Sequence, residues 1–313
     1  MGQDLYENCQ LCPNLCGVDR TSGKTGRCNE SSSVRIAWAG LHKGEEPPVS
    51  GANGSGMVFF CGCPLHCAYC QNYQISSAGG AGFTVSVSEL ATIFKELQNF
   101  GATTLNLVTG THFVPSIIQA LELAKKDGFS LPVVWNSSGY ETVQTLRLID
   151  PYIDLYLLDA KTLDKEVGRT FCGLASYADA IVPVMQFLKR RHPVTDLEKL
   201  KGVLVRHLVF PGTLDSTFSF LKWFADNYAQ NFRLSLMVQF VPPKANPGFK
   251  SMTRDEYHKL TDYLEGLDID GFVQEQDDNE ILWIPDFNRD NPFPDGFAKV
   301  LPLFLEYKRM RGL

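Results

Sequence analysis

A chain of 313 residues is long for a β-sandwich or a helical bundle but lies within the size range of one large α/β domain. Hydrophobic residues make up 44%, and no apolar run reaches the roughly 18 residues that a membrane helix requires, so no membrane association is expected. A formal net charge of −6 offers no general attraction to nucleic acid. The N-terminus lacks a basic cluster followed by an apolar stretch, which predicts a cytoplasmic protein.

The first thirty residues contain four closely spaced cysteines: Cys9, Cys12, Cys16 and Cys28. Because the cytoplasm keeps thiols reduced, metal binding explains this clustering better than disulfides. Four thiolates could close a structural zinc site or hold an iron–sulfur cluster, and the spacing does not separate these alternatives from each other. Unpaired structural thiols are the third interpretation. We predict a metal-binding segment over residues 1–30 and a connecting segment over 31–56.

A second group of cysteines, Cys63, Cys67 and Cys70, directly follows the first predicted strand. Three thiolates at these spacings can hold three irons of a four-iron cubane and leave the fourth iron open to a substrate or cofactor. The same spacing would also align three cysteines on one face of a helix. Gly62 and Pro64 disfavour a helix interior and indicate a loop at the end of the strand.

From residue 57 onward, apolar β-rich segments alternate with helical patterns, which is typical of a parallel sheet with crossover helices. The predicted strands are 57–62, 104–110, 131–137, 155–161, 203–212 and 234–242. Ser86 and Glu89 form a capping box that begins a helix ending at Gly101. Further helices are expected around 117–123, 177–191, 216–229, 254–266 and 297–310. The sequence therefore predicts an α/β fold, a partial (β/α)6 barrel with a C-terminal helical extension over residues 57–313.

Polar residues stand at the C-terminal ends of nearly all predicted strands, although buried parallel strands are otherwise apolar. They are Thr109, His112, Asn136, Ser138, Asp159, Lys161, Arg206, His207 and Gln239. In α/β barrels the chemistry lies at this end of the strands. The three-cysteine loop leaves the first strand at the same end, so we expect cysteines and polar side chains to surround one cavity.

The Cys63-x3-Cys67-x2-Cys70 motif, with Tyr69 before its last cysteine, resembles the signature of the radical S-adenosylmethionine (SAM) enzymes. This resemblance implies a 4Fe-4S cluster on the three cysteines with SAM bound at its open iron. It also implies reductive cleavage of SAM to a 5′-deoxyadenosyl radical that abstracts hydrogen from a substrate. Tyr69 would lie against the adenine or shield the cluster from water.

Further motifs resemble the activating enzyme of pyruvate formate-lyase and its PflX-like relatives. The matching segments are residues 9–18, 54–56, 111–115, 136–140 and 205–209. The resemblance implies a protein substrate, with installation of a glycyl radical as one form of the reaction. It also implies a reductant such as flavodoxin or ferredoxin.

The superfamily's Gly-Gly-Glu after the second strand is replaced here by Val-Thr-Gly-Thr-His at residues 108–112. We expect Thr109 and His112 to contact the SAM amino group in its place, with a purely structural His112 as the alternative. Asn136 and Ser138 stand where the family contacts the methionine or ribose part of SAM.

Asp159 and Lys161 resemble the Asp-x-Lys of glycyl-radical activating enzymes, and their spacing puts both on one side of a strand. An ordinary ion pair is the alternative. Arg206 and His207 point in opposite directions on a regular strand, and we favour His207 as the residue that reaches the substrate. Cys61 and Cys172 are interpreted as packed thiols.

Three functions stay open. The first is a radical SAM enzyme acting on a protein, and the second is the same chemistry on a small molecule or RNA, with RNA weakened by the acidic charge balance. The third is a non-catalytic iron–sulfur electron carrier, which would need neither an open iron nor a ring of polar strand ends. SAM binding separates the carrier from the enzymes, and hydrogen-isotope transfer into 5′-deoxyadenosine separates the two substrates.

Overall fold

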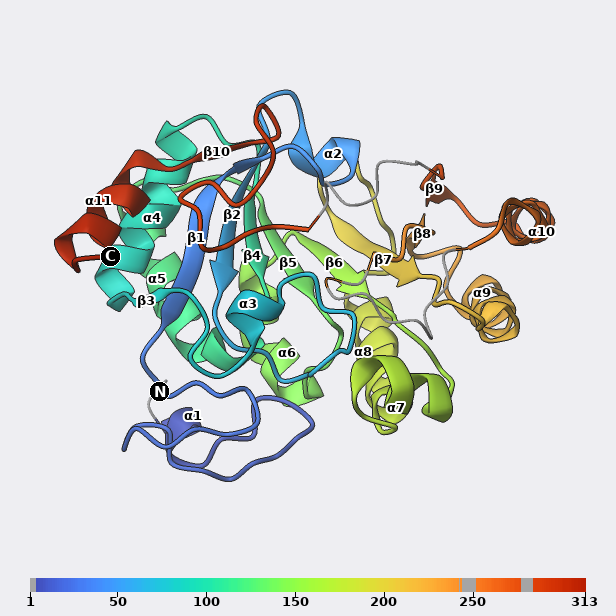
Figure 1. The fold of residues 1–313 in the computed structure, drawn as a ribbon, viewed down its shortest axis with the longest axis horizontal. Helices are drawn as coiled ribbons and strands as arrows, with labels where there is room; N and C mark the ends of the chain where they lie inside the picture. The colour runs from blue at the N-terminus through green and yellow to red at the C-terminus, as the bar shows by residue number, and fades with distance from the viewer. Residues whose placement is uncertain (1–3, 242, 244–251, 277–283) are drawn as a thin grey trace.

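The described residues form a central sheet of ten strands, in the order β10-β1-β2-β4-β5-β6-β7-β8-β9 with β3 paired to β1 (Figure 1). The computed structural model describes residues 4–241, 243, 252–276 and 284–313. Its strands are β1 (Arg35–His42), β2 (Ser55–Phe60), β3 (Phe83–Thr84), β4 (Leu105–Val108), β5 (Val133–Ser137), β6 (Leu155–Asp159), β7 (Gly202–Leu208), β8 (Arg233–Met237), β9 (Gly271–Val273) and β10 (Ala298–Val300).

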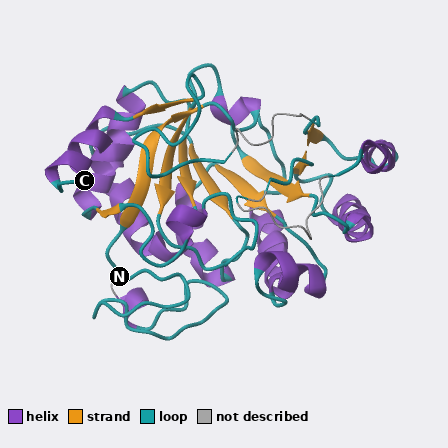
Figure 2. Ribbon diagram, viewed as in Figure 1, coloured by secondary structure: helices purple, strands orange, loops and turns teal. Residues whose placement is uncertain are grey.

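Helices surround the margin of this curved sheet (Figure 2). The α-helices are α1 (Asp4–Glu7), α2 (Pro47–Ser50), α3 (Tyr73–Ser76), α4 (Val87–Asn99), α5 (Val114–Lys126), α6 (Val143–Ile149), α7 (Lys165–Cys172), α8 (Tyr177–Arg191), α9 (Leu214–Asn227), α10 (Arg254–Glu265) and α11 (Pro302–Met310). Two short 3-10 helices are η1 (Thr111–Phe113) and η2 (Asp150–Tyr152). Within the described ranges no individual helix is long and apolar enough to cross a bilayer. Taken together, α7 and α8 reach that length and apolar composition, but they are bent by 102° relative to each other.

The strands β2, β4, β5, β6, β7 and β8 pair in parallel, which confirms the predicted alternating α/β fold. They correspond to the six predicted strands, although position 242, the expected end of the last one, lies outside the described residues. The segment 31–56, expected to be a connection, contains β1, which pairs antiparallel with β2 and β10. The start of the expected helix 297–310 is instead β10, and α11 begins only at Pro302.

Local capping chemistry sets the start of α4 as predicted. The Ser86 side chain accepts a hydrogen bond from the Glu89 backbone N–H, and the Glu89 carboxylate accepts one from the Ser86 N–H. Leu90, Phe94 and their neighbours at helical spacing are fully buried. The helix is thus held on the sheet by an apolar stripe.

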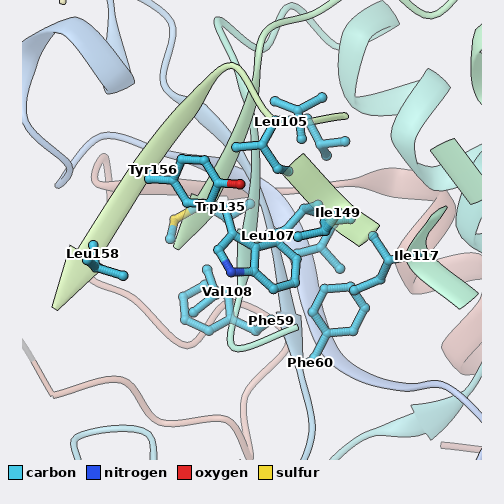
Figure 3. Close-up of a cluster of buried hydrophobic side chains, with 14 of the residues drawn as sticks. Phe59, Phe60, Leu105, Leu107, Val108, Ile117, Trp135, Ile149, Tyr156 and Leu158 are labelled. Atoms are coloured by element: carbon cyan, nitrogen blue, oxygen red, sulfur yellow. The ribbon is translucent and has the colours of Figure 1, made fainter. Parts of the chain in front are cut away.

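Trp135 lies at the centre of the core between the parallel strands and the helices behind them (Figure 3). It stands beside Leu107 in the register of β4 and β5. Its indole N–H donates to the buried Glu141 carboxylate over 3.4 Å, and Thr111 donates to the same oxygen over 2.8 Å. This packing holds the ends of β4 and β5, where the candidate site begins, in one arrangement.

Asp150 joins α6, β6 and α8, and its carboxylate contributes to stability in a pH-dependent way. It accepts hydrogen bonds from Tyr156 (3.0 Å), Arg191 (2.8 Å) and His192 (2.7 Å). Burial alone would raise the pKa of Asp150, but the hydrogen bonds from His192 and Arg191 outweigh it and lower the pKa below the ordinary 3.8. The stabilisation is therefore fully present above about pH 4 and is lost as the pH falls through the pKa of the folded state.

Asp150→Asn is expected to lower the free energy of unfolding at pH 7 by about 1–3 kcal/mol and to flatten its decline below about pH 4. Urea unfolding midpoints at several pH values measure both effects. The control is Asp226→Asn, which removes an exposed ion pair with Lys222 and should change stability by less than about 1 kcal/mol. Equal acid sensitivity in the native protein and Asp150→Asn would contradict the assignment.

Candidate active site

A cavity of about 400 Å³ opens at the C-terminal ends of the parallel strands. Its walls include most of the predicted site residues, namely Cys63, Cys67, Tyr69, Cys70, Thr109, Asn136, Ser138, Asp159, Lys161, Arg206 and Gln239. His112 and His207 are not among the residues that line it. The four N-terminal cysteines lie elsewhere, in the segment around α1 (Figure 1).

The cysteine loop connects β2 to α3 and contains no helix between Cys63 and Cys70, so the helix alternative is wrong. The Cys70 N–H donates to the Cys67 carbonyl over 3.2 Å, and the Ala68 N–H donates to the Phe171 carbonyl over 2.9 Å. Burial, followed by the neighbouring Cys67, raises the pKa of Cys70 to about 11. A buried thiol of this kind ionises when a cation binds, because the metal replaces its proton.

The residues around the loop fit an iron–sulfur cluster with an organic ligand beside it. The three thiols face one cavity from a single loop. Within the described chain, no three His, Cys, Asp or Glu side chains converge as around a single ion. A four-iron cubane is larger than an ion, so its thiolates need not meet at one point. The buried Tyr69 hydroxyl has no hydrogen-bond partner among the described residues and is therefore available to a bound molecule.

Tyr69 belongs to an aromatic group that separates the loop from solvent. Its ring centroid lies 5.0 Å from that of Phe210 and 5.4 Å from that of Phe240. Phe171 stacks on Phe210 at 4.4 Å, and Cys67 packs against the group. The apolar wall lowers the dielectric around the thiols and restricts water.

Thr109 lines the cavity in a strained backbone conformation, whereas His112 faces away from it. Thr109 has φ +59°, which a β-branched residue rarely adopts, and its N–H donates to the Asn136 carbonyl over 2.9 Å. His112 is 1% exposed, and its Nε2 lies 2.7 Å from the Cys61 carbonyl. Burial, followed by the charge of Arg20, lowers the pKa of His112 to about 3. This placement favours the structural alternative for His112 over its expected contact with SAM.

Asp159 and Lys161 face the cavity together and form an ion pair, and their resemblance to the Asp-x-Lys of activating enzymes stays a prediction. Lys161 Nζ donates to the Asp159 carboxylate over 2.7 Å. Burial opposes the charge of Lys161, but the Asp159 carboxylate outweighs it and raises the lysine pKa. The Tyr177 hydroxyl accepts from the Lys161 backbone N–H over 3.0 Å and lies 2.8 Å from the Asp159 carbonyl, which orients the end of β6.

Arg206 rather than His207 lines the cavity at β7, which disfavours His207 as the residue that reaches the substrate. His207 is 2% exposed, stacks on Phe220 at 4.0 Å, and its Nδ1 lies 2.8 Å from the Ala160 carbonyl. Burial lowers the pKa of His207 to about 4, so the ring stays neutral against α9. A neutral imidazole is far easier to bury among helix side chains than a guanidinium, which decides the orientation of the strand.

Two candidate functional residues, Glu45 and Glu46, were not predicted from the sequence. Arg206 donates to Glu45 over 2.8 Å and to both carboxylate oxygens of Glu46 over 2.9 and 2.5 Å. Asn106 and Asn136 each donate to the same Glu45 oxygen over 3.3 Å. Glu45 thus orients the Asn136 amide at the cavity wall. The signal in the sequence is that these two adjacent residues, directly before Pro47-Pro48, are the only acidic residues of the segment 31–56.

Gly62 is the point where the N-terminal segment packs on the cysteine loop. It has φ +76°, and a Cβ there would lie 2.5 Å from the Cys28 carbonyl and would also clash with Glu30. For an alanine, the left-handed backbone alone would lower the free energy of unfolding by about 1–2 kcal/mol. Gly62→Ala is expected to have a larger effect, because the clash with Cys28 and Glu30 adds to this strain. Thermal unfolding measures this effect.

Gly79→Ala is the matched control for Gly62→Ala. Gly79 has a similar φ of +70°, but no atom lies within 4 Å of the position that an alanine Cβ would occupy there, so only the backbone strain applies. Equal destabilisation by the two substitutions would show that the contact between Gly62 and the N-terminal segment contributes nothing.

Comparisons with known proteins agree with this geometry. The model of the Radical SAM superfamily matches residues 57–222. An uncharacterized protein from Methanocaldococcus jannaschii is 29% identical over 282 residues, covering 86% of this chain and 78% of that protein. The pyruvate formate-lyase-activating enzyme of Clostridium pasteurianum is 25% identical over 241 residues, covering 70% of this chain and 93% of the enzyme.

Solved structures that resemble the chain include Streptococcus suis SuiB bound to S-adenosylmethionine, with 13% identity, a TM-score of 0.44 and coverage of 68% of this chain and 45% of SuiB. The chain thus spans less than half the length of SuiB. A radical SAM methyltransferase from Sphaerobacter thermophilus has 12% identity, a TM-score of 0.48 and coverage of 78% and 70%.

The family match begins at the start of the predicted barrel, contains all three cysteines of the loop and extends over more than half of the 313 residues. It confirms the predicted superfamily, and the similarity to an activating enzyme confirms the broader resemblance. The PflX-like branch stays a prediction. The chain belongs to the radical SAM superfamily.

Proposed function

We propose that this chain carries a 4Fe-4S cluster on Cys63, Cys67 and Cys70, binds SAM at its open iron and abstracts hydrogen from a protein substrate. The observation that carries the proposal is the single cavity into which the three thiols, Thr109 and Asn136 all face. With both groups bound, the cofactors supply a 5′-deoxyadenosyl radical. Installation of a glycyl radical is the form of the reaction that we favour.

The chain's own residues would position and protect the cofactors. Thr109 and the Asn136 amide would offer polar groups to the amino-acid and ribose parts of SAM, and Glu45 holds that amide in place. Lys161 stays charged beside Asp159 and offers a hydrogen-bond donor at the cavity wall. The aromatic group around Tyr69 shields the cysteine loop from water.

Two observations favour a protein over a small molecule or RNA. The Clostridium pasteurianum relative is an activating enzyme and is matched over 93% of its length. The sheet is also open, because β9 and β10 form its two ends in the described strand order. The net charge of −6 disfavours RNA. We further propose a cytoplasmic location and a flavodoxin or ferredoxin as the reductant, since a catalytic cluster needs reduced surroundings.

The test follows deuterium from candidate substrates into 5′-deoxyadenosine. A perdeuterated cell extract is separated into small molecules and macromolecules, and each fraction is incubated anaerobically with reconstituted protein, SAM and dithionite. We expect deuterated 5′-deoxyadenosine only with the macromolecular fraction, and we expect protease but not ribonuclease treatment to abolish it. Mass spectrometry of 5′-deoxyadenosine gives the readout.

Each other outcome rejects a different part of the proposal. Deuterium transfer from the small-molecule fraction would show that the substrate is a small molecule. Loss of the transfer after ribonuclease treatment would show that it is RNA. Absence of SAM binding by equilibrium dialysis to the loaded protein would remove the enzymatic function and favour the electron carrier.

A further inference from the structure

The cysteines of the N-terminal segment are held in a frame of tight turns. The Cys9 N–H donates to the Val18 carbonyl over 3.1 Å, and the Gly17 N–H donates back to the Cys9 carbonyl over 3.0 Å. A Cβ on Gly26 would lie only 2.9 Å from Cys16 Sγ, so a glycine is needed for the chain at Gly26 to approach the sulfur. Cys9, Cys12 and Cys28 are buried in the segment.

Hydrogen-bond donors point at three of these sulfurs. The Arg27 backbone N–H lies 3.4 Å from Cys16 Sγ, and the Asn14 amide lies 3.5 Å from Cys12 Sγ. Arg20 Nη1 lies 3.7 Å from Cys9 Sγ. Donors of this kind are the outer partners that stabilise metal-bound thiolates. The guanidinium of Arg20 gains more from an ionised thiolate than from a neutral thiol, because the opposite charges attract each other.

Arg20 is the observation that favours a negative charge here. The rings of Tyr6 and Phe113 lie 4.9 and 5.7 Å from its Cζ and stabilise only part of its charge. Its side chain is 0% exposed, and it donates to the backbone carbonyls of Glu30, Ser31 and His112. In the part of the chain that the structure describes, no carboxylate forms an ion pair with it. The nearby Glu30 carboxylate pairs with Arg35 at 2.8 Å. A buried guanidinium without an anionic partner is strongly destabilising.

We propose that Cys9, Cys12, Cys16 and Cys28 hold a 4Fe-4S cluster of their own and that Arg20 compensates its negative charge. Because no three of the described His, Cys, Asp or Glu side chains converge as around a single ion, a cubane fits these four thiols better than Zn²⁺ does. Four thiolates around an oxidised 4Fe-4S core leave a net negative charge.

The same centre stabilises the loop that carries the other three cysteines. Asn14, beside Cys12, donates to the Pro64 carbonyl over 2.8 Å. Arg20 bonds to the His112 carbonyl, and the His112 ring bonds in turn to the Cys61 carbonyl. Loss of the N-terminal centre therefore loosens the chain on both sides of Cys63.

The test measures metal in a protein whose other metal site has been removed. The Cys63→Ala/Cys67→Ala/Cys70→Ala variant is produced with iron and zinc supplied, purified anaerobically, and analysed for zinc, iron and acid-labile sulfide. We expect about four iron and four sulfide per chain. About one zinc without iron, or a folded variant with neither metal, would overturn the proposal.

Single substitutions in this triple variant assign the ligands. Cys28→Ser should abolish the bound metal, whereas Cys61→Ala, a buried thiol that donates to the Ala81 carbonyl, should retain it. Arg20→Met should accelerate metal release to a chelator by about 10-fold or more, as loss of an outer-shell partner does, and Arg20→Lys should restore part of the retention. Metal retained in folded Cys28→Ser, or release unchanged in Arg20→Met, would contradict the assignment.

Discussion

Cys67→Ala is expected to reduce SAM-dependent 5′-deoxyadenosine formation by more than about 100-fold. Loss of a residue that only hydrogen-bonds to a metal ligand costs about 10- to 100-fold, and loss of a ligand itself should cost more. Cys67 is the middle cysteine of the loop, faces the cavity and packs against the aromatic group of Tyr69. Without it the cluster would have two protein ligands in place of three. Anaerobic assays with dithionite, with iron and sulfide measured on the same samples, give both activity and cluster content.

Cys61→Ala is the matched control for this prediction. Cys61 is also buried and lies on the same stretch of chain, but its thiol donates to the Ala81 carbonyl over 3.3 Å and does not belong to the cavity wall. We expect it to retain iron and activity. Full activity in Cys67→Ala would show that another side chain holds the cluster.

Arg206→Met is expected to lower the free energy of unfolding by about 3–5 kcal/mol, because it leaves Glu45 and Glu46 buried without their counter-charge. Arg206→Lys should recover only part of this stability, since one ammonium cannot reproduce the contacts of the guanidinium with both carboxylates. Urea unfolding of the native protein, Arg206→Met and Arg206→Lys measures these differences in the free energy of unfolding.

Two further comparisons distinguish the effect of leaving buried charges unpaired from the effect of simply removing a side chain. Arg233→Met removes an ion pair with Asp270, whose side chain is 73% exposed, and should change stability by less than about 1 kcal/mol. Adding Glu45→Gln and Glu46→Gln to Arg206→Met should restore stability, because the unpaired charges are then absent. No recovery in that combination would mean that Arg206 stabilises β7 by packing alone.

The sequence predicts those features that depend on neighbouring residues. Ser86 and Glu89 predict the start of α4, since a capping box lies within one helical turn. Gly62 and Pro64 predict the loop that carries the cysteines, because both residues disfavour a helix. β1 escaped prediction because it is buried on both faces along most of its length and shows no polar and apolar alternation.

Residue spacing was sufficient to predict the three-cysteine motif, the parallel strands and the polar residues at the strand ends, because each of these depends on a short stretch of chain. It also predicted that Arg206 and His207 lie on opposite sides of β7. Which of them faces the cavity depends on Glu46, 160 positions earlier in the chain, and on Phe220 of α9. Only the tertiary structure brings the carboxylate to one side of the strand and the aromatic ring to the other, and burial of charge then selects Arg206 for the cavity.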